Sequence, residues 1–253
     1  MHPAPSLSRS DLWCLAAGIA LLIVASWGYL IYEDWAMRHM DVVAMAMPGT
    51  GSWSPADLLL VFIMWAVMMI AMMLPSALPM LLIYHRLAAS GGRAGRQTTV
   101  FAAGYLCLWT AFSLAATIAQ WGLHTLTLVT PAEVLSNRWI AAALLVAAGA
   151  YQLTATKRAC LTRCSSPLQF LQRQWREGPR GAWRMGLLHG AYCIGCCWLL
   201  MALLFVYGVM NLAWIASLTL FVLCEKLIPP NRWLPRLSAL VFIGWGITVG
   251  LWR

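Results

Sequence analysis

The chain has 253 residues, of which 62% are hydrophobic and only 10% are charged, and its formal net charge is +9. A soluble domain of this length needs more charged side chains to cover its surface, so the composition excludes an ordinary soluble globular protein. Several apolar runs exceed the roughly 18 residues that mark a transmembrane helix. The sequence therefore predicts an all-α fold, a polytopic transmembrane helical bundle formed as a single integral membrane domain over residues 1–253.

Seven apolar segments predict seven membrane spans. The first segment is too long for the core of a cleavable signal peptide and lacks a small-residue cleavage site, so it is expected to remain as a span. The last three segments include a pair separated by three residues, 209–211, which predicts a tight helical hairpin. In chain order the spans are expected at 12–32, 57–83, 99–121, 139–156, 185–208, 212–228 and 237–252.

The loops between these spans alternate in charge. One side of the membrane collects 14 basic residues, seven of them in the loop 157–184, and the other side collects three. The positive-inside rule then places the N-terminus in the cytoplasm, the C-terminus outside, and the loop 33–56 on the outer face. Since the basic residues set orientation in this way, the net charge does not indicate a nucleic-acid partner.

A histidine and three cysteines share one apolar segment, residues 189–197, which reads HGAYCIGCC. On a helix, His189, Cys193, Cys196 and Cys197 fall within an arc of about 100°. Ligands spaced i, i+3 and i+4 on one face can converge on a single metal ion. A thiolate alone in lipid is costly, but a bound cation neutralises it. The segment therefore predicts a metal site near the cytoplasmic side.

Two further segments on the same predicted side are candidates for the remaining ligands. Cys160 and Cys164 lie four residues apart in KRACLTRC, again on one face of a helix. Glu225 is an ionisable residue inside an apolar run, which indicates a functional group; alternatively it is a structural partner for Lys226 or a loop arginine. Lys226 itself is expected to extend to the lipid headgroups.

Small residues within the same segment favour close helix packing. Gly186 and Gly190 lie four residues apart near the face that carries the cysteines, so a second helix can approach and bring further ligands. The isolated cysteines Cys14, Cys107 and Cys224 are interpreted as small packing residues.

The pattern predicts a protein that handles or transports copper or zinc, and the alternative is a membrane metalloenzyme or a thiol–disulfide oxidoreductase that uses the same cysteines. The spacing of Cys193 and Cys196 is that of the C-x-x-C motif of thiol–disulfide oxidoreductases. A permanent structural disulfide is not expected in the reducing cytoplasm, although a catalytic one remains open. The third cysteine, Cys197, and the additional pair Cys160 and Cys164 favour a metal site. The chain shows no ATP-binding loop and no nucleophile elbow, so the sequence assigns no reaction.

Methionines suggest which metal the site prefers. Residues 64–80 read MWAVMMIAMMLPSALPM, with a stripe at helical spacing, and the predicted outer loop adds more soft ligands. Thioethers suit Cu(I) better than Zn(II), so the pattern favours copper slightly over zinc. The alternative is that the stripe only fills the core. The residues concerned are Met64, Met68, Met69, Met72, Met73 and Met80 in the span and His39, Met40, Met45 and Met47 in the loop.

Two prolines, Pro75 and Pro79, are expected to break the inner half of the second span. Their missing N–H groups free backbone carbonyls, which a membrane helix tolerates only where protein or a cavity surrounds them.

These segments together resemble a bacterial family described as predicted metal-binding integral membrane proteins of unknown function. The resemblance rests on residues 64–80, the run H-G-x-x-C-x-G-C-C-W from His189, and the later C-E-K-L-I-P-P. It implies a metal site and a location in the bacterial inner membrane, but no reaction. The family often carries a histidine between the two loop cysteines, where this chain has Arg163. The expected partners are the lipid bilayer, the metal ion, and either a metallochaperone or a second copy of the chain.

Overall fold

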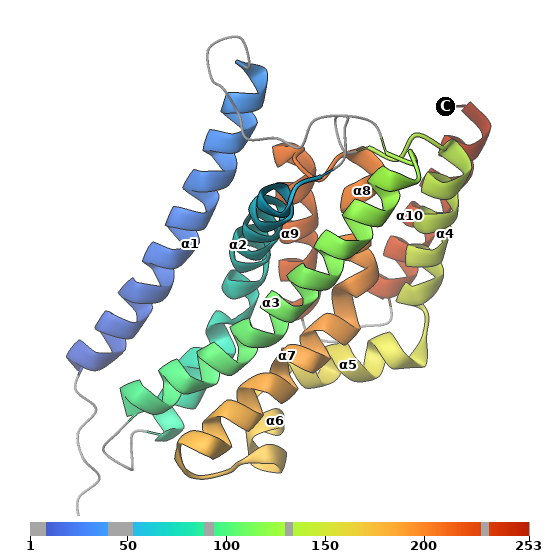
Figure 1. The fold of residues 1–253 in the computed structure, drawn as a ribbon. Helices are drawn as coiled ribbons and strands as arrows, with labels where there is room; N and C mark the ends of the chain where they lie inside the picture. The colour runs from blue at the N-terminus through green and yellow to red at the C-terminus, as the bar shows by residue number, and fades with distance from the viewer. Residues whose placement is uncertain (1–8, 40–52, 89–93, 130–133, 229–232, 253) are drawn as a thin grey trace, which may run out of the picture.

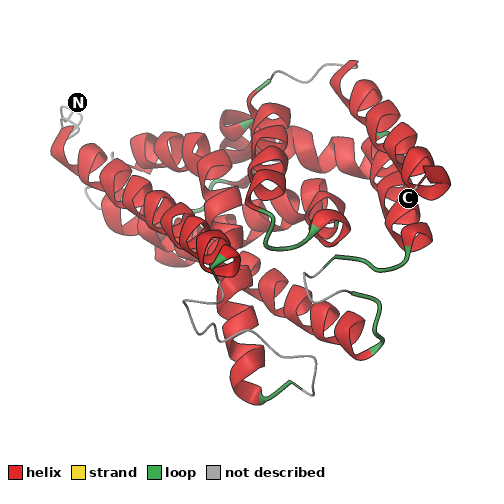
Figure 2. Cartoon of the chain, turned by 90° about the horizontal axis from the view of Figure 1, so that it is seen from above, coloured by secondary structure: helices red, strands yellow, loops and turns green. Residues whose placement is uncertain are grey.

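The computed structural model describes residues 9–39, 53–88, 94–129, 134–228 and 233–252. Within these residues almost all of the chain is helical, and the β structure is a single bridge between Val129 and Leu135. The long helices pack side by side (Figure 1), and the view from above shows the same bundle end-on (Figure 2). The all-α prediction is confirmed. Met40, Met45 and Met47 of the predicted outer loop lie outside the described residues.

The helices follow the predicted spans closely at most positions. In chain order they are α1 (Arg9–Arg38), α2 (Pro55–Ala88), α3 (Ala94–Thr125), α4 (Arg138–Gln152), α5 (Ala155–Ser165), α6 (Pro167–Gln174), α7 (Gly178–Ala202), α8 (Leu204–Tyr207), α9 (Leu212–Leu227) and α10 (Trp233–Trp252).

Five helices of the described chain are long and apolar enough to cross a membrane, or six if the pair α4 and α5, bent by 66°, counts as one span. Helix α9 has only 16 residues. The fold is thus compatible with a membrane protein, while seven spans and a cytoplasmic N-terminus remain predictions. The start of α1 and the end of α10 lie at opposite ends of the bundle (Figure 1).

The predicted loop 157–184 is where the structure departs most from expectation. It contains most of α5 and all of α6, and these two helices lie across the lower end of the bundle (Figure 1). Thr154 begins α5, because its hydroxyl accepts a hydrogen bond from the backbone N–H of Lys157 at 3.2 Å. Pro167 stands in the first turn of α6, where a missing N–H costs nothing. The predicted span 139–156 accordingly ends early, at Gln152.

The prolines of α2 do not break it, contrary to the prediction. Helix α2 continues from Pro55 to Ala88 with Pro75 and Pro79 inside it. Pro75 leaves the carbonyl of Ala71 without its helical donor, and the indole N–H of Trp27 from α1 donates to that oxygen at 3.1 Å. A neighbouring helix therefore satisfies the freed carbonyl, and the span stays intact.

Glycines bring α3 and α7 into close contact. A Cβ atom at Gly186 would collide with the carbonyl oxygen of Phe101, and one at Gly104 would lie 2.6 Å from the carbonyl oxygen of Trp183. At Gly190 an added Cβ would lie 3.2 Å from the Leu108 side chain. The close approach predicted from the small residues of α7 is thus present, and the partner helix is α3.

Candidate metal-binding site

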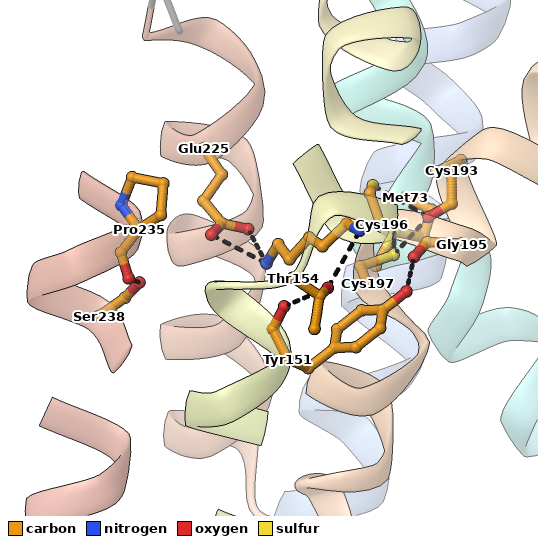
Figure 3. A network of polar contacts seen from close by, with 11 residues as sticks. Met73, Tyr151, Thr154, Cys193, Gly195, Cys196, Cys197, Glu225, Pro235 and Ser238 are labelled. Atoms are coloured by element: carbon orange, nitrogen blue, oxygen red, sulfur yellow. Dashed lines mark hydrogen bonds and ion pairs between the residues drawn. The ribbon is translucent and has the colours of Figure 1, made fainter. Parts of the chain in front are cut away.

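Four buried thiols gather where α5 meets α7. Cys193, Cys196 and Cys197 lie in the middle of α7, and Cys164 lies near the end of α5. The Cys164 thiol interacts with those of Cys193 and Cys196. The thiols of Cys196 and Cys197 donate to the carbonyl oxygen of Cys193 at 3.1 and 2.9 Å (Figure 3). The helix thus turns its three sulfurs toward one region of the core, as the spacing predicts.

A methionine from α2 extends this cluster. The Sδ atom of Met73 lies 4.0 Å from the Sγ atom of Cys197, and Met73 is fully buried. The other methionines of the stripe, Met64, Met68, Met69, Met72 and Met80, are also buried in the core. Their burial is consistent with a packing role, and among the described residues a hydrogen-bond contact with a cysteine of the cluster is seen for Met73.

Lys226 contacts the cluster, contrary to the expectation that it would extend to the headgroups. Its side chain is buried, with a relative exposure of 6%. The Nζ atom lies 3.0 Å from the Sγ atom of Cys193 and 2.7 Å from the hydroxyl oxygen of Ser76. The orientation of α9 explains the difference, because its buried face carries this lysine inward between α2 and α7.

Glu225 pairs with Lys157 and not with Lys226. Both carboxylate oxygens accept hydrogen bonds from the Lys157 Nζ atom, at 3.0 and 2.9 Å, and the two side chains are only 2% and 3% exposed. The pair joins α5 to α9. Of the alternatives left open for Glu225, a structural ion pair is the one that these contacts support, although its partner was expected to be Lys226 or an arginine.

Tyr105 of α3 is a member of the site that the sequence did not indicate. Its hydroxyl group donates to the carbonyl oxygen of Met73 at 3.2 Å and lies 3.2 Å from the Cys193 sulfur. The sequence pointed to Tyr105 only indirectly. Gly186 and Gly190 predicted a closely packed neighbouring helix, but not which side chains that helix brings to the site. Cys193 therefore has a hydroxyl, an ammonium group and further thiols around it.

Cys160 and His189 lie beside the four thiols in different surroundings. The Sγ atom of Cys160 packs so closely that a Cβ atom at Gly195 would lie 2.8 Å from it. The Tyr151 hydroxyl donates to the Gly195 carbonyl at 2.5 Å and fixes this contact (Figure 3). The His189 ring lies among aromatic rings, with centroids 6.1 Å from Phe101, 5.5 Å from Tyr105 and 5.5 Å from Phe170.

The described residues contain no group of three or more histidine, cysteine, aspartate or glutamate side chains already arranged to hold a metal ion. The donor set is nevertheless a chemically consistent one, because thiols and a thioether are soft ligands that suit Cu(I). The residues present therefore fit a soft metal ion, although no coordination geometry is preformed among the described residues.

Comparison with curated proteins and with solved structures gives no match. One family model, described as "PpoB2: Copper chaperone", matches residues 62–249. The matched region runs from α2 to α10 and includes Met73, Tyr105, the four thiols and Lys226. Because it covers about three quarters of the chain, the protein belongs to the PpoB2 copper chaperone family.

Proposed function

We propose that this protein is an integral membrane copper chaperone, which binds Cu(I) at the buried thiol cluster and passes it to an acceptor protein. The observation that carries the proposal is the convergence of four buried thiols from α5 and α7 around Cys193, with the Met73 thioether beside Cys197. The family description supports copper as the cargo. The charge pattern of the loops supports an inner-membrane location with the cluster toward the cytoplasmic side.

Cys193 is proposed as the constant ligand of a site that holds Cu(I) by two thiolates at a time, with Cys164, Cys196 and Cys197 as the thiols that supply the second ligand in turn. Cu(I) is commonly held by two or three soft ligands, and exchange among neighbouring sulfurs allows the ion to move without leaving the cluster. Cys160 is only half-buried, so we assign it to the step in which the cargo enters or leaves. His189 borders the cluster, and Glu225 orients α9 through Lys157.

Cu(I) binding to the purified protein tests this proposal. The protein in detergent is titrated with Cu(I) in competition with a chelator of known affinity, under reducing conditions. The wild-type protein is expected to bind Cu(I), and Cys193→Ser is expected to weaken binding by about tenfold or more, because a hydroxyl is a poor ligand for a soft ion. Cys107→Ser is the matched control, since this cysteine is exposed and lies outside the cluster.

Two outcomes would overturn the proposal. One is Cu(I) binding by Cys193→Ser that equals that of Cys107→Ser. The other is a metal-free protein, active in its cellular role, that cycles a Cys193–Cys196 disulfide, which would favour the thiol–disulfide oxidoreductase instead.

A further inference from the structure

We propose that Lys226 sets the metal specificity of the thiol site. Its buried positive charge balances the single negative charge of the complex that Cu(I) forms with two thiolates. The inference rests on the proposed function and adds to it a residue that is not itself a ligand. Lys226 does not bind the ion itself. It positions the Cys193 sulfur and adds a positive charge that balances the charge of the metal complex.

The contacts of Lys226 place its charge at the sulfur. Its Nζ atom lies 3.0 Å from Cys193 and is held from the other side by the Ser76 hydroxyl at 2.7 Å. Lys226 has no carboxylate within ion-pair distance among the described residues, in contrast to Lys157, which pairs with Glu225. A buried ammonium group that has no carboxylate partner is costly, so an anion at this position would be strongly favoured.

Charge balance then decides which ion completes the site. When Cu(I) binds two thiols, both S–H bonds break, two protons leave to solvent, two Cu–S bonds form, and no electron is transferred. The complex carries one negative charge, and the Lys226 ammonium group brings the total to zero. Zn(II) on the same two thiolates is already neutral, so the lysine would leave a net positive charge in an apolar core, which is unfavourable.

The neighbouring ion pair keeps the lysine in this position. Glu225 precedes Lys226 in α9 and is bonded through both oxygens to Lys157 of α5, the same helix that carries Cys164. Because Glu225 is neutralised locally by Lys157, its charge does not compete for Lys226. The charge of Lys226 therefore remains available to the thiols.

The test compares Cu(I) and Zn(II) affinities of the purified full-length protein, each measured against a competing chelator. Lys226→Leu removes the charge without adding a donor atom for the metal, whereas Lys226→Arg keeps the charge. Ser76→Ala is the matched control, since it removes the other contact of Lys226 and leaves the charge in place.

Lys226→Leu is expected to lower the Cu(I) affinity by about 10- to 100-fold, as the loss of a charge-assisted contact would, and to raise the Zn(II) affinity by at least about threefold. Lys226→Arg and Ser76→Ala are expected to preserve the wild-type order of the two metals. If Lys226 had a purely structural role, its loss would lower the affinities for Cu(I) and Zn(II) together. Opposite changes in the two affinities therefore indicate an effect of charge. If Lys226→Leu does not fold, Lys226→Gln gives the same comparison.

An unchanged ratio of Cu(I) to Zn(II) affinity in the neutral variants would overturn the inference while leaving the proposed function intact. Failure of the wild-type protein to bind Cu(I) would instead overturn the proposed function. Since the two failures appear in different samples, they are distinguishable.

Discussion

The chain contains only two lysines among its 17 basic residues, and both are buried. Lys157 faces a carboxylate, with two hydrogen bonds to Glu225. Lys226, the next residue after that glutamate, faces the Cys193 thiol and the Ser76 hydroxyl. Glu225, the partner of Lys157, and Lys226 are thus adjacent in the chain. Lys157 has a full counter-charge inside the protein, whereas Lys226 has none among the described residues.

This difference separates a structural charge from a functional one. A buried ion pair with both oxygens bonded is internally neutral, so its main effect is to fix the positions of the helices that carry it. A buried ammonium group beside thiols has its charge unsatisfied until a thiolate complex forms. The comparison therefore supports a structural role for the Lys157 site and the proposed role in cargo binding for the Lys226 site.

The largest effect on stability is expected when Lys157, the paired lysine, is replaced. Lys157→Met leaves the Glu225 carboxylate buried without a partner, and we expect a loss of about 3–5 kcal/mol in the free energy of unfolding. Thermal unfolding of the purified protein in detergent measures it. Lys226→Met, which removes a charge that lacks a carboxylate partner, is expected to cost much less.

The double variant Lys157→Met with Glu225→Leu is the matched control for that experiment. Replacing both members of a buried pair by apolar residues is often close to neutral, so it should recover most of the lost stability. Equal destabilisation by Lys157→Met and Lys226→Met would contradict the distinction between the two lysines.

A smaller effect is expected at Tyr105, which contacts Cys193 from α3. Tyr105→Phe removes the hydroxyl that donates to the Met73 carbonyl and touches the sulfur, at an expected cost of about 0.5–1.5 kcal/mol of stability. If the hydroxyl also stabilises the metal-bound thiolate, the Cu(I) affinity falls several-fold in the chelator competition, while the preference for Cu(I) over Zn(II) is kept. Tyr84→Phe is the matched control, since Tyr84 is equally buried but its hydroxyl has no partner among the described residues. A reversal of the metal preference in Tyr105→Phe would show that Lys226 is not the group that sets it.

The parts of this site that the sequence predicts are those that lie within one helix. Spacings of three and four residues place Cys193, Cys196 and Cys197 on a common face, and this holds for any helix of that sequence. The contacts of Cys164, Tyr105 and Lys226 depend instead on how α5, α3 and α9 pack against α7. The directions in which these three side chains point are set by packing between distant parts of the chain, which the spacing of residues within one helix does not reveal.

The same distinction explains the errors in the fold. Long apolar helices are visible in composition alone, so the helices at these segments were predicted well, while seven membrane spans remain a prediction. Helix α5 is polar on average and has no apolar stripe, so most of it was assigned to the loop 157–184, although the spacing of Cys160 and Cys164 indicated a helical turn there. Its orientation matters for the site, since it brings Cys164 to the thiols and Lys157 to Glu225. The ion pair could not be assigned because Lys157 was placed in solvent with the arginines around it.

The smallest expected effect concerns Met73, which tests how far the functional region extends into α2. Met73→Leu conserves apolar volume, so the stability cost should stay below about 1.5 kcal/mol. A thioether 4.0 Å from the Cys197 sulfur needs little movement to join a Cu(I) ion held by the thiols, whereas leucine offers no donor atom. We therefore expect Cu(I) affinity to fall a few-fold and Zn(II) affinity to stay unchanged, since Zn(II) gains little from thioethers. Met68→Leu is the control, because Met68 is equally buried in the same helix and accepts no hydrogen bond from a cysteine thiol among the described residues. If the two leucine variants bind Cu(I) alike, Met73 is a packing residue, and the cargo site is confined to the cysteines and to Lys226.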